Sequence, residues 1–315
     1  MFIDLLIEKI KEKNNPTVAG LDPQLDYIPS YIVEKYKNKS VDFFEACAGA
    51  IYEFNTTIID SICDLVPAVK LQLACYEMYG VQGMACFQKT IRYAKDKGLL
   101  VIADGKRNDI GSTAKAYSAA YLGKTNAGGL EYSVFDVDAL TVNPYLGYDG
   151  IEPFIEDCKK YGKGIFVLVK TSNKSSGQLQ DVNTQDGRFI YEIIADYVNK
   201  WGSELTGKYG YSSVGAVVGA TYPEQAFELR KLMKSSYILV PGYGAQGGTA
   251  RDAAKSFNKD GLGAIVNSSR GIMCAYKSEK WRGIFNEDSF GNAARAEVID
   301  MRDKLNNEID RLKSC

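Results

Sequence analysis

Short apolar runs rich in β-branched residues alternate along the chain with longer segments of helical periodicity. Each run is five to seven residues long and is bounded by glycine, proline or polar residues, which is typical of buried strands rather than helices. The eight candidate strands are 17–21, 66–71, 99–103, 139–143, 164–170, 214–219, 237–241 and 263–267.

The segments between these strands carry apolar residues at three- and four-residue steps, as an amphipathic helix requires. Residues 42–64 are the clearest case, with Phe43, Cys47, Ile51, Phe54, Ile58 and Ile62 on one face. Further helices are expected near 1–15, 80–97, 112–123, 150–160, 188–200, 223–234, 249–258 and 292–312. Eight strands, each followed by a helix, predict an α/β fold, a (β/α)8 TIM barrel, forming a single domain over 1–315 with flanking helices at both ends.

Polar residues gather where the predicted strands end. In (β/α)8 barrels the chemistry lies at the carboxyl ends of the strands, so these residues are expected to converge on one rim. They are Asp22, Lys70, Asp104, Lys106, Asn143, residues 170–172, residues 241–246 and residues 267–270. The polar stretch 171–188 follows the fifth strand, and is either an active-site loop or a mobile surface excursion.

The segment VIADGKRNDIGST, 101–113, is the most informative part of the rim. Asp104 and Lys106 are two residues apart on extended backbone, so their side chains point the same way. With Asp109 they place three charged groups at the mouth of one strand, where desolvation makes charges costly. A solvated salt-bridge turn is the alternative, but the polar groups from other strands favour a functional site.

Composition narrows the possible functions. The net charge of −1 gives no bias toward nucleic acid or anionic membranes, and we expect neither as a partner. The first fifteen residues are amphipathic rather than a signal peptide, so a cytoplasmic location is expected. The chain has no histidine, which excludes histidine bases and histidine metal sites. The seven cysteines include no CxxC pair and are expected to be reduced thiols.

Glycines after the seventh strand indicate an anion site. Repeated glycine lets backbone N–H groups face an anion closely, and the loops after strands seven and eight commonly hold phosphate in such barrels. Arg270, just past the eighth strand, can bind phosphate with two parallel hydrogen bonds. We discount GYGAQG at 242–247 as a dinucleotide fingerprint because no acidic residue ends the next strand. GSELTGKY at 202–209 lacks the Ser or Thr of a Walker A loop.

On these motifs the chain resembles the orotidine 5'-monophosphate decarboxylase family, over nearly the whole barrel. The family's Asp-x-Lys-x-x-Asp motif, followed by Ile and Thr, stands here from Asp104 to Thr113. Its GLDP element stands at 20–23, its strand-two lysine in VKLQ, and its PGxGAQGG element at 241–248. The loops at 143–150 and 170–176 resemble a longer bacterial subgroup, which usually has proline where Lys174 stands here.

The resemblance implies cofactor-free, metal-free decarboxylation of orotidine 5'-monophosphate to UMP and CO2 in pyrimidine synthesis. It assigns catalysis to Lys106, Asp104, Asp109 and Lys70. It assigns substrate binding to Asp22, Thr113, Ser172, Asn143, Pro241, Gln246 and Arg270. Lys106 would protonate the C6 carbanion, with Asp104 and Asp109 on either side keeping it charged. The resemblance further implies a homodimer in which Asp109 and Thr113 reach into the partner's site.

Two other functions are weighed against this one. A related barrel that uses magnesium to decarboxylate or condense sugar phosphates would bind the metal through the first acid of the same motif. A non-catalytic nucleotide-binding barrel would need none of the matched catalytic positions, all of which are intact here.

Overall fold

Eight parallel strands close into a barrel in the computed structural model, which describes residues 1–314. The strand order around the barrel is β1-β10-β9-β8-β7-β6-β3-β2, and each strand pairs in parallel with both neighbours. The strands are β1 (Thr17–Leu21), β2 (Ala68–Gln72), β3 (Leu100–Arg107), β6 (Ala139–Val142), β7 (Gly164–Lys170), β8 (Ser212–Val218), β9 (Ser236–Val240) and β10 (Ala264–Ser268). The predicted (β/α)8 barrel is therefore confirmed.

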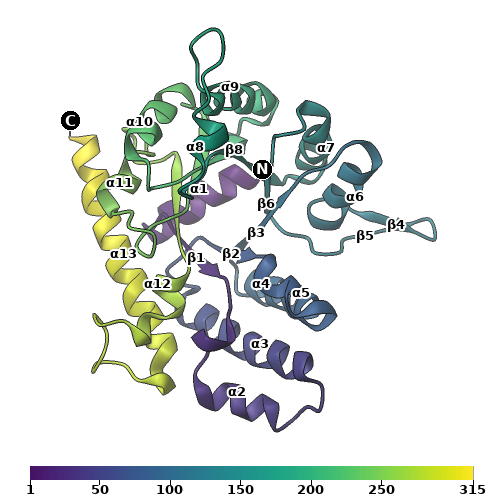
Figure 1. Cartoon of the computed structure of the whole chain (residues 1–315), viewed down its shortest axis with the longest axis vertical. Coiled ribbons are helices and arrows are strands. Elements are labelled where there is room, and N and C mark those ends of the chain that lie inside the picture. The colour runs from purple at the N-terminus through teal and green to yellow at the C-terminus, as the bar shows by residue number, and fades with distance from the viewer. Residues whose placement is uncertain (315) are drawn as a thin grey trace.

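Helices surround this barrel (Figure 1). The predicted ones are α1 (Phe2–Lys13), α3 (Phe43–Ile62), α5 (Gly80–Asp96), α6 (Gly111–Tyr121), α7 (Glu152–Tyr161), α9 (Ile190–Gly202), α10 (Pro223–Leu232), α11 (Ala250–Ala254) and α13 (Phe290–Lys313). Short helices that the sequence pattern did not reveal are α2 (Ser30–Lys37), α4 (Ala74–Glu77), α8 (Gly177–Gln180) and α12 (Arg270–Met273). The 3₁₀ turns lie at Leu25–Tyr27, Tyr148–Gly150, Ser203–Leu205, Ala275–Lys277 and Glu287–Ser289.

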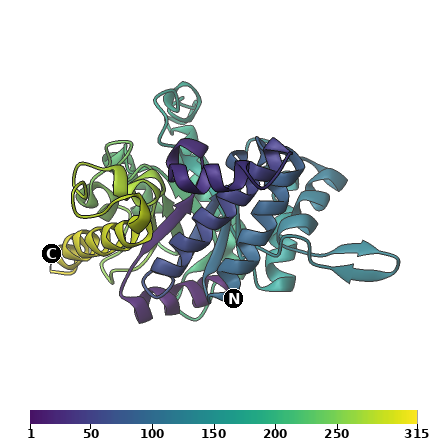
Figure 2. The same cartoon turned by 90° about the horizontal axis from the view of Figure 1, so that it is seen from below.

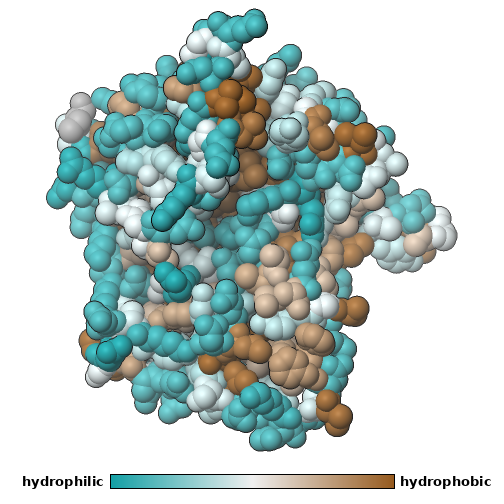
Figure 3. All heavy atoms as spheres, in the orientation of Figure 1, coloured by the Kyte–Doolittle hydropathy of each residue, from teal (hydrophilic) through white to brown (hydrophobic). Residues whose placement is uncertain are grey.

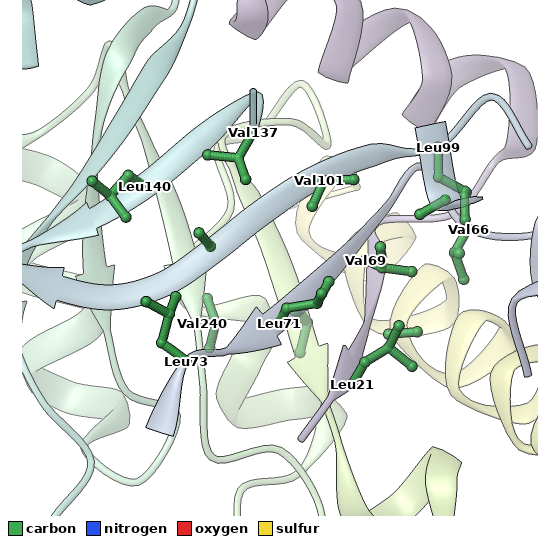
Figure 4. Packing of buried hydrophobic residues seen from close by; sticks show 14 of the residues in the cluster. Leu21, Val66, Val69, Leu71, Leu73, Leu99, Val101, Val137, Leu140 and Val240 are labelled. Atoms are coloured by element: carbon green, nitrogen blue, oxygen red, sulfur yellow. The ribbon is translucent and has the colours of Figure 1, made fainter. Parts of the chain in front are cut away.

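Alternation along the strands divides the buried residues into two cores. In β3, Val101 and Ala103 belong to the large core between barrel and helices, whereas Leu100 and Ile102 belong to a smaller core inside the barrel. Figure 4 shows Val101 of the outer core with neighbours from β2 and β6. The next inward positions of β3 are Asp104 and Lys106. The two-residue alternation of side chains along the strand therefore places these charged groups directly above an apolar layer.

Helix α1 closes the amino-terminal end of the barrel. Its buried residues Phe2, Ile3, Leu6 and Ile7 join the inner core, and the Phe2 ring meets that of Phe166 edge to face at 6.1 Å. This apolar plug leaves the carboxyl-terminal end of the barrel as the end where a polar cavity can open.

A two-stranded hairpin, β4 (Thr125–Ala127) and β5 (Leu130–Tyr132), projects from the barrel after α6. It extends well clear of the other elements in two views (Figures 1 and 2) and stands out at the right of the space-filling view (Figure 3). All of its strand residues are exposed. The sequence analysis missed it because a strand without a buried face shows no hydrophobic alternation.

Two sequence expectations need correction. The third strand does not end at 103 but continues through Arg107, so Asp104 and Lys106 lie in the strand rather than after it. Phe43 does not belong to the buried face of α3, because its side chain is 56% exposed beside the N-cap Asp42. Within residues 1–314, no helix has the length and apolar character needed to cross a membrane.

Candidate active site

A cavity of about 750 Å³ opens at the carboxyl ends of the barrel strands. Eight of the eleven residues that the resemblance assigns to the site line it: Asp22, Lys70, Asp104, Lys106, Ser172, Pro241, Gln246 and Arg270. They come from β1, β2, β3, β7, β9 and β10 or the loops that follow them. The expected convergence of polar groups on one rim is therefore observed.

Four of these side chains form a chain of alternating charge. Lys70 Nζ lies 3.5 Å from Asp22 Oδ1 and 2.9 Å from Asp104 Oδ2. The other oxygen of Asp104, Oδ1, accepts a hydrogen bond from Lys106 Nζ at 2.7 Å. Asp104 thus links the two lysines, and Lys106 is the exposed end of the chain, with 44% of its side chain accessible.

Burial and charge act in opposite directions on this array. Burial alone would raise the pKa of Asp104, but Lys70 and Lys106 outweigh it and hold that pKa well below its usual value. Burial would likewise lower the pKa of Lys70, and Asp104 and Asp22 outweigh it, so that pKa is raised. Both groups therefore stay ionised across the physiological range, and a fixed carboxylate holds Lys106 in place.

The backbone at Lys106 is unusual. Lys106 has a φ of 47°, in the left-handed region that non-glycine residues seldom adopt. The β3–β6 register shifts between Ala103 and Arg107, as at the β-bulges that re-aim side chains next to active sites. Thr141 of β6 supports this geometry, since its Oγ1 accepts from the Lys106 N–H at 2.9 Å and donates to Asp104 Oδ1 at 2.8 Å.

The glycine-rich loop after β9 forms the opposite side of the cavity from β3. Gly242, Gly244 and Gly247 all have positive φ, at 91°, 67° and 95°, so only glycine fits this loop without strain. Arg270 donates through Nη2 to the Ala245 carbonyl at 3.3 Å. The guanidinium and the loop backbone thus lie together at the rim, as a phosphate site requires.

Ser172 reaches the cavity from the loop after β7, next to that glycine loop. A Cβ on Gly219 would lie 2.8 Å from the Ser172 Cβ, so the glycine leaves room for the serine to pack. Thr221 Oγ1 donates to the Ser172 carbonyl at 3.1 Å. Lys174, which replaces the subgroup's usual proline, is exposed in the same loop, and the loop is closed locally by the Ser176 N–H bonded to the Asn173 carbonyl at 3.1 Å.

Three of the eleven assigned residues do not line the cavity of this chain: Asp109, Thr113 and Asn143. Asp109 Oδ1 accepts from the Ile110 N–H at 2.8 Å just before α6, and Thr113 is exposed on that helix. Asn143 Oδ1 accepts from the Tyr145 N–H at 3.0 Å. Within one chain, then, Asp104 and not Asp109 is the carboxylate beside Lys106.

Several cavity residues were missed by sequence reasoning. Gln72 Nε2 donates to Asp104 Oδ2 at 3.0 Å, so that oxygen is bonded to two donors. Thr141 faces inward from a buried strand. Strand alternation was the available signal for both residues, because each lies two residues from an inward apolar or charged position.

The second discounted motif, 202–209, lies away from the cavity. The Lys208 N–H donates to Asp4 Oδ1 of α1 at 2.9 Å, and a Cβ on Gly207 would meet the same carboxylate. A loop whose backbone faces a carboxylate at the closed end of the barrel is not a phosphate site.

Together, the barrel and its cavity define a class of protein: a (β/α)8 enzyme with a lysine–carboxylate centre in the cavity and, apart from it, an arginine beside a glycine-rich loop at the rim. Residues 41–283 match the family described as Orotidine 5'-phosphate decarboxylase / HUMPS family. The chain belongs to this family.

Individual proteins agree with this assignment. An orotidine 5'-phosphate decarboxylase of Caldicellulosiruptor saccharolyticus is 46% identical over 277 residues, covering 88% of this chain and 90% of that protein. The enzyme of the same name from Clostridium tetani is 42% identical over 305 residues, covering 97% and 98%. The structure of Leishmania donovani OMP decarboxylase superposes with a TM-score of 0.67 at 27% identity, covering 96% of this chain and 98% of that one.

Proposed function

We propose that the chain converts orotidine 5'-monophosphate to UMP and CO2, as a cytoplasmic enzyme of pyrimidine biosynthesis that uses no metal or cofactor. The observation that carries this function is the charge array Asp22–Lys70–Asp104–Lys106, which presents the exposed ammonium group of Lys106 to the cavity. Relatives that are 40–46% identical over most of the chain bear the name of this activity.

The reaction needs a cation and a proton at one carbon atom. The bond between C6 of the pyrimidine and its carboxylate breaks, CO2 leaves, and the electron pair remains on C6. Lys106 Nζ stabilises this charge and then transfers a proton to C6, giving UMP and a neutral lysine that regains a proton from water. Asp104 and Thr141 fix Lys106 before substrate arrives, so little reorganisation is needed during the reaction.

Substrate binding is assigned to the rest of the cavity. Arg270, Gln246 and the backbone after Pro241 hold the phosphate, Ser172 contacts the pyrimidine, and Asp22 contacts the ribose. Lys70 stays with the catalytic group, where it balances the charge of the carboxylates. The phosphate lies far from the reacting carbon, so its binding energy is available to close the glycine loop over the site and exclude water.

We further propose a homodimer with shared sites. Asp109 and Thr113 lie outside the cavity of their own chain, at the start of α6, a position from which they are able to reach a neighbouring subunit. In this arrangement each site takes Asp104, Lys106 and Lys70 from one chain and Asp109 and Thr113 from the other. Asn143 is assigned to the substrate as well, although it bonds to its own loop in the single chain.

The proposal is tested by turnover of the purified protein. Loss of orotidine 5'-monophosphate absorbance should be accompanied by one UMP and one CO2 per substrate consumed. A folded protein that binds UMP but does not turn over the substrate would instead support the nucleotide-binding alternative.

The magnesium-dependent alternative is distinguished by the same assay after exhaustive chelation. Both cavity carboxylates, Asp22 and Asp104, already face lysine ammonium groups, which favours the metal-free reaction. Turnover should be unchanged by EDTA. Activity that disappears on chelation and returns with magnesium would favour the sugar-phosphate reaction class.

A further inference from the structure

A second lysine lies fully buried beside the active site, outside the charge array. Lys170 ends β7 and its side chain is 0% exposed. The β7–β8 register shifts between Leu168 and Lys170. Leu168 lines the cavity but Lys170 does not, because this irregularity turns the lysine out of the barrel.

Lys170 makes one ion pair and contacts two aromatic rings. Its Nζ lies 2.6 Å from Asp181 Oδ1, 4.5 Å from the centre of the Tyr222 ring and 5.7 Å from that of Tyr191. Lysine is rarely buried completely, since desolvating the ammonium is costly. An apolar side chain would fill the same space without that cost, but it would not hold the Asp181 carboxylate.

The two partners bracket the loop that forms one wall of the cavity. Lys170 precedes this loop, residues 171–180, and Asp181 follows it. Within it, the Gln180 side chain accepts from the Thr171 N–H at 3.0 Å and donates to Thr171 Oγ1 at 2.8 Å. Tyr222, which covers the lysine, also donates from its hydroxyl to the Asn173 carbonyl at 3.1 Å.

Four residues of the loop line the cavity: Thr171, Ser172, Asn173 and Gln180. The ion pair closes the base of the loop, and Gln180 and Tyr222 join its arms to one another and to the barrel. The loop is thereby fixed at both ends by contacts within the chain.

We propose that the Lys170–Asp181 ion pair is a positioning device for the reaction, which holds the 171–180 wall at the place where the pyrimidine binds. Lys170 does not touch the substrate in this account; it acts through Asp181 and the loop. The inference rests on the proposed decarboxylation for its kinetic consequence. Its structural consequence, a loop held closed by the pair, is independent of that function.

The test uses Lys170→Met and Asp181→Asn in the full-length enzyme, with Lys163→Met as the matched control. Lys163 lies just before β7, at the opposite end of the same strand, and its Nζ pairs with Asp136 at 2.7 Å. The control therefore also removes a partly buried ion pair, but one far from the cavity. Asp181→Asn serves if Lys170→Met folds poorly, because Asp181 is 37% exposed.

Two readouts are measured on each variant. The first is the rate of tryptic cleavage after the exposed Lys174, identified by the mass of the fragments, which reports loop opening without any turnover. The second is the kcat and KM of decarboxylation per folded molecule. Loss of the pair should speed that cleavage and lower kcat/KM roughly 10- to 100-fold, since misplacing a contact by an ångström is worth about that much. The Lys163→Met control should match wild type in both.

Non-additivity provides the check that the pair acts as a unit. The double variant Lys170→Met/Asp181→Asn should lose no more than the worse single variant. Wild-type cleavage and wild-type kcat/KM in both single variants would overturn the proposal. If the wild-type enzyme itself does not turn over, the decarboxylase function fails, and the cleavage rates alone still decide whether the pair holds the loop.

Discussion

Thr141 Oγ1 accepts a hydrogen bond from the backbone N–H of Lys106 at 2.9 Å, and the Lys106 backbone adopts a left-handed conformation. The threonine is 1% exposed and also donates to Asp104. A buried hydroxyl on the neighbouring strand therefore fixes both the backbone and the carboxylate that aim the lysine.

Replacing this threonine should impair chemistry more than binding. Thr141→Val keeps the shape but removes both hydrogen bonds, and a bond to a charged group is worth about 1.5–3 kcal/mol. We expect kcat to fall roughly ten- to a hundredfold with a smaller change in KM. Thr141→Ser retains the hydroxyl and should recover most of the activity. Equal losses in the two variants would mean that the hydroxyl does not position Lys106.

Arg270→Ala should weaken substrate capture while leaving the fold intact. Losing one partner of a desolvated charge pair, here the arginine that faces the bound phosphate, costs roughly 2–5 kcal/mol. Arg270 is exposed at the rim, and within residues 1–314 it forms no ion pair with a carboxylate that the substitution would break. The loss should appear in kcat/KM and not in Tm. Gln246→Ala should act in the same direction but more mildly, because it contributes a neutral hydrogen bond. Arg92→Ala, exposed on α5, is the matched control, and an Arg270 variant indistinguishable from it would remove Arg270 from the phosphate site.

The charge array should make stability depend on acid pH through Asp104. Its folded-state pKa lies below the usual aspartate value of about 3.9, so it stabilises the fold fully above that pH. This contribution is lost as pH falls through the range below about 4, because the unfolded chain then binds the proton more readily. Urea unfolding from pH 7 to 2.5 should show a steeper acid limb for wild type than for Asp104→Asn. Asp310→Asn, exposed on α13, should keep the wild-type slope; identical slopes for all three proteins would contradict the ionised, buried Asp104.

Shared sites should be revealed by mixing two inactive proteins, Lys106→Ala and Asp109→Ala. If subunits exchange freely, half of the dimers are hybrids. One site of each hybrid then carries both defects and the other carries none, because a two-fold interface is reciprocal. About a quarter of wild-type activity should return. If exchange is verified by mass and activity stays at the level of the separate variants, Asp109 acts within its own chain.

The barrel was predictable from the sequence because a parallel strand that is buried on both faces appears as a continuous apolar run. All eight strands were located, since each is a short β-branched run closed off by polar residues. Elements without a buried face show no hydrophobic pattern, and the exposed hairpin at 125–132 and the short helix α8 were therefore both missed. The end of β3 was misplaced because charged residues read as loop, although Asp104 is itself buried in the strand.

The part of the site that was predictable from the sequence consists of charged residues at the carboxyl ends of the strands. Asp22, Lys70, Asp104 and Lys106 were all selected and all converge. Thr141 was not, because a single polar residue inside an apolar strand resembles any tolerated buried hydroxyl. Lys170 was selected only as part of a strand end, and its partner Asp181 lies eleven residues away across an irregular loop that no periodicity describes.

The central claim, that Lys106 supplies the cation and the proton, is tested most directly by the turnover of Lys106→Ala. The control is Lys89→Ala, an exposed lysine on α5. General acid catalysis alone contributes roughly 10²–10⁴-fold, so kcat should fall at least that far while UMP still binds, and Lys89→Ala should keep wild-type turnover. A Lys106→Ala protein that decarboxylates orotidine 5'-monophosphate within tenfold of the wild-type rate would contradict the account.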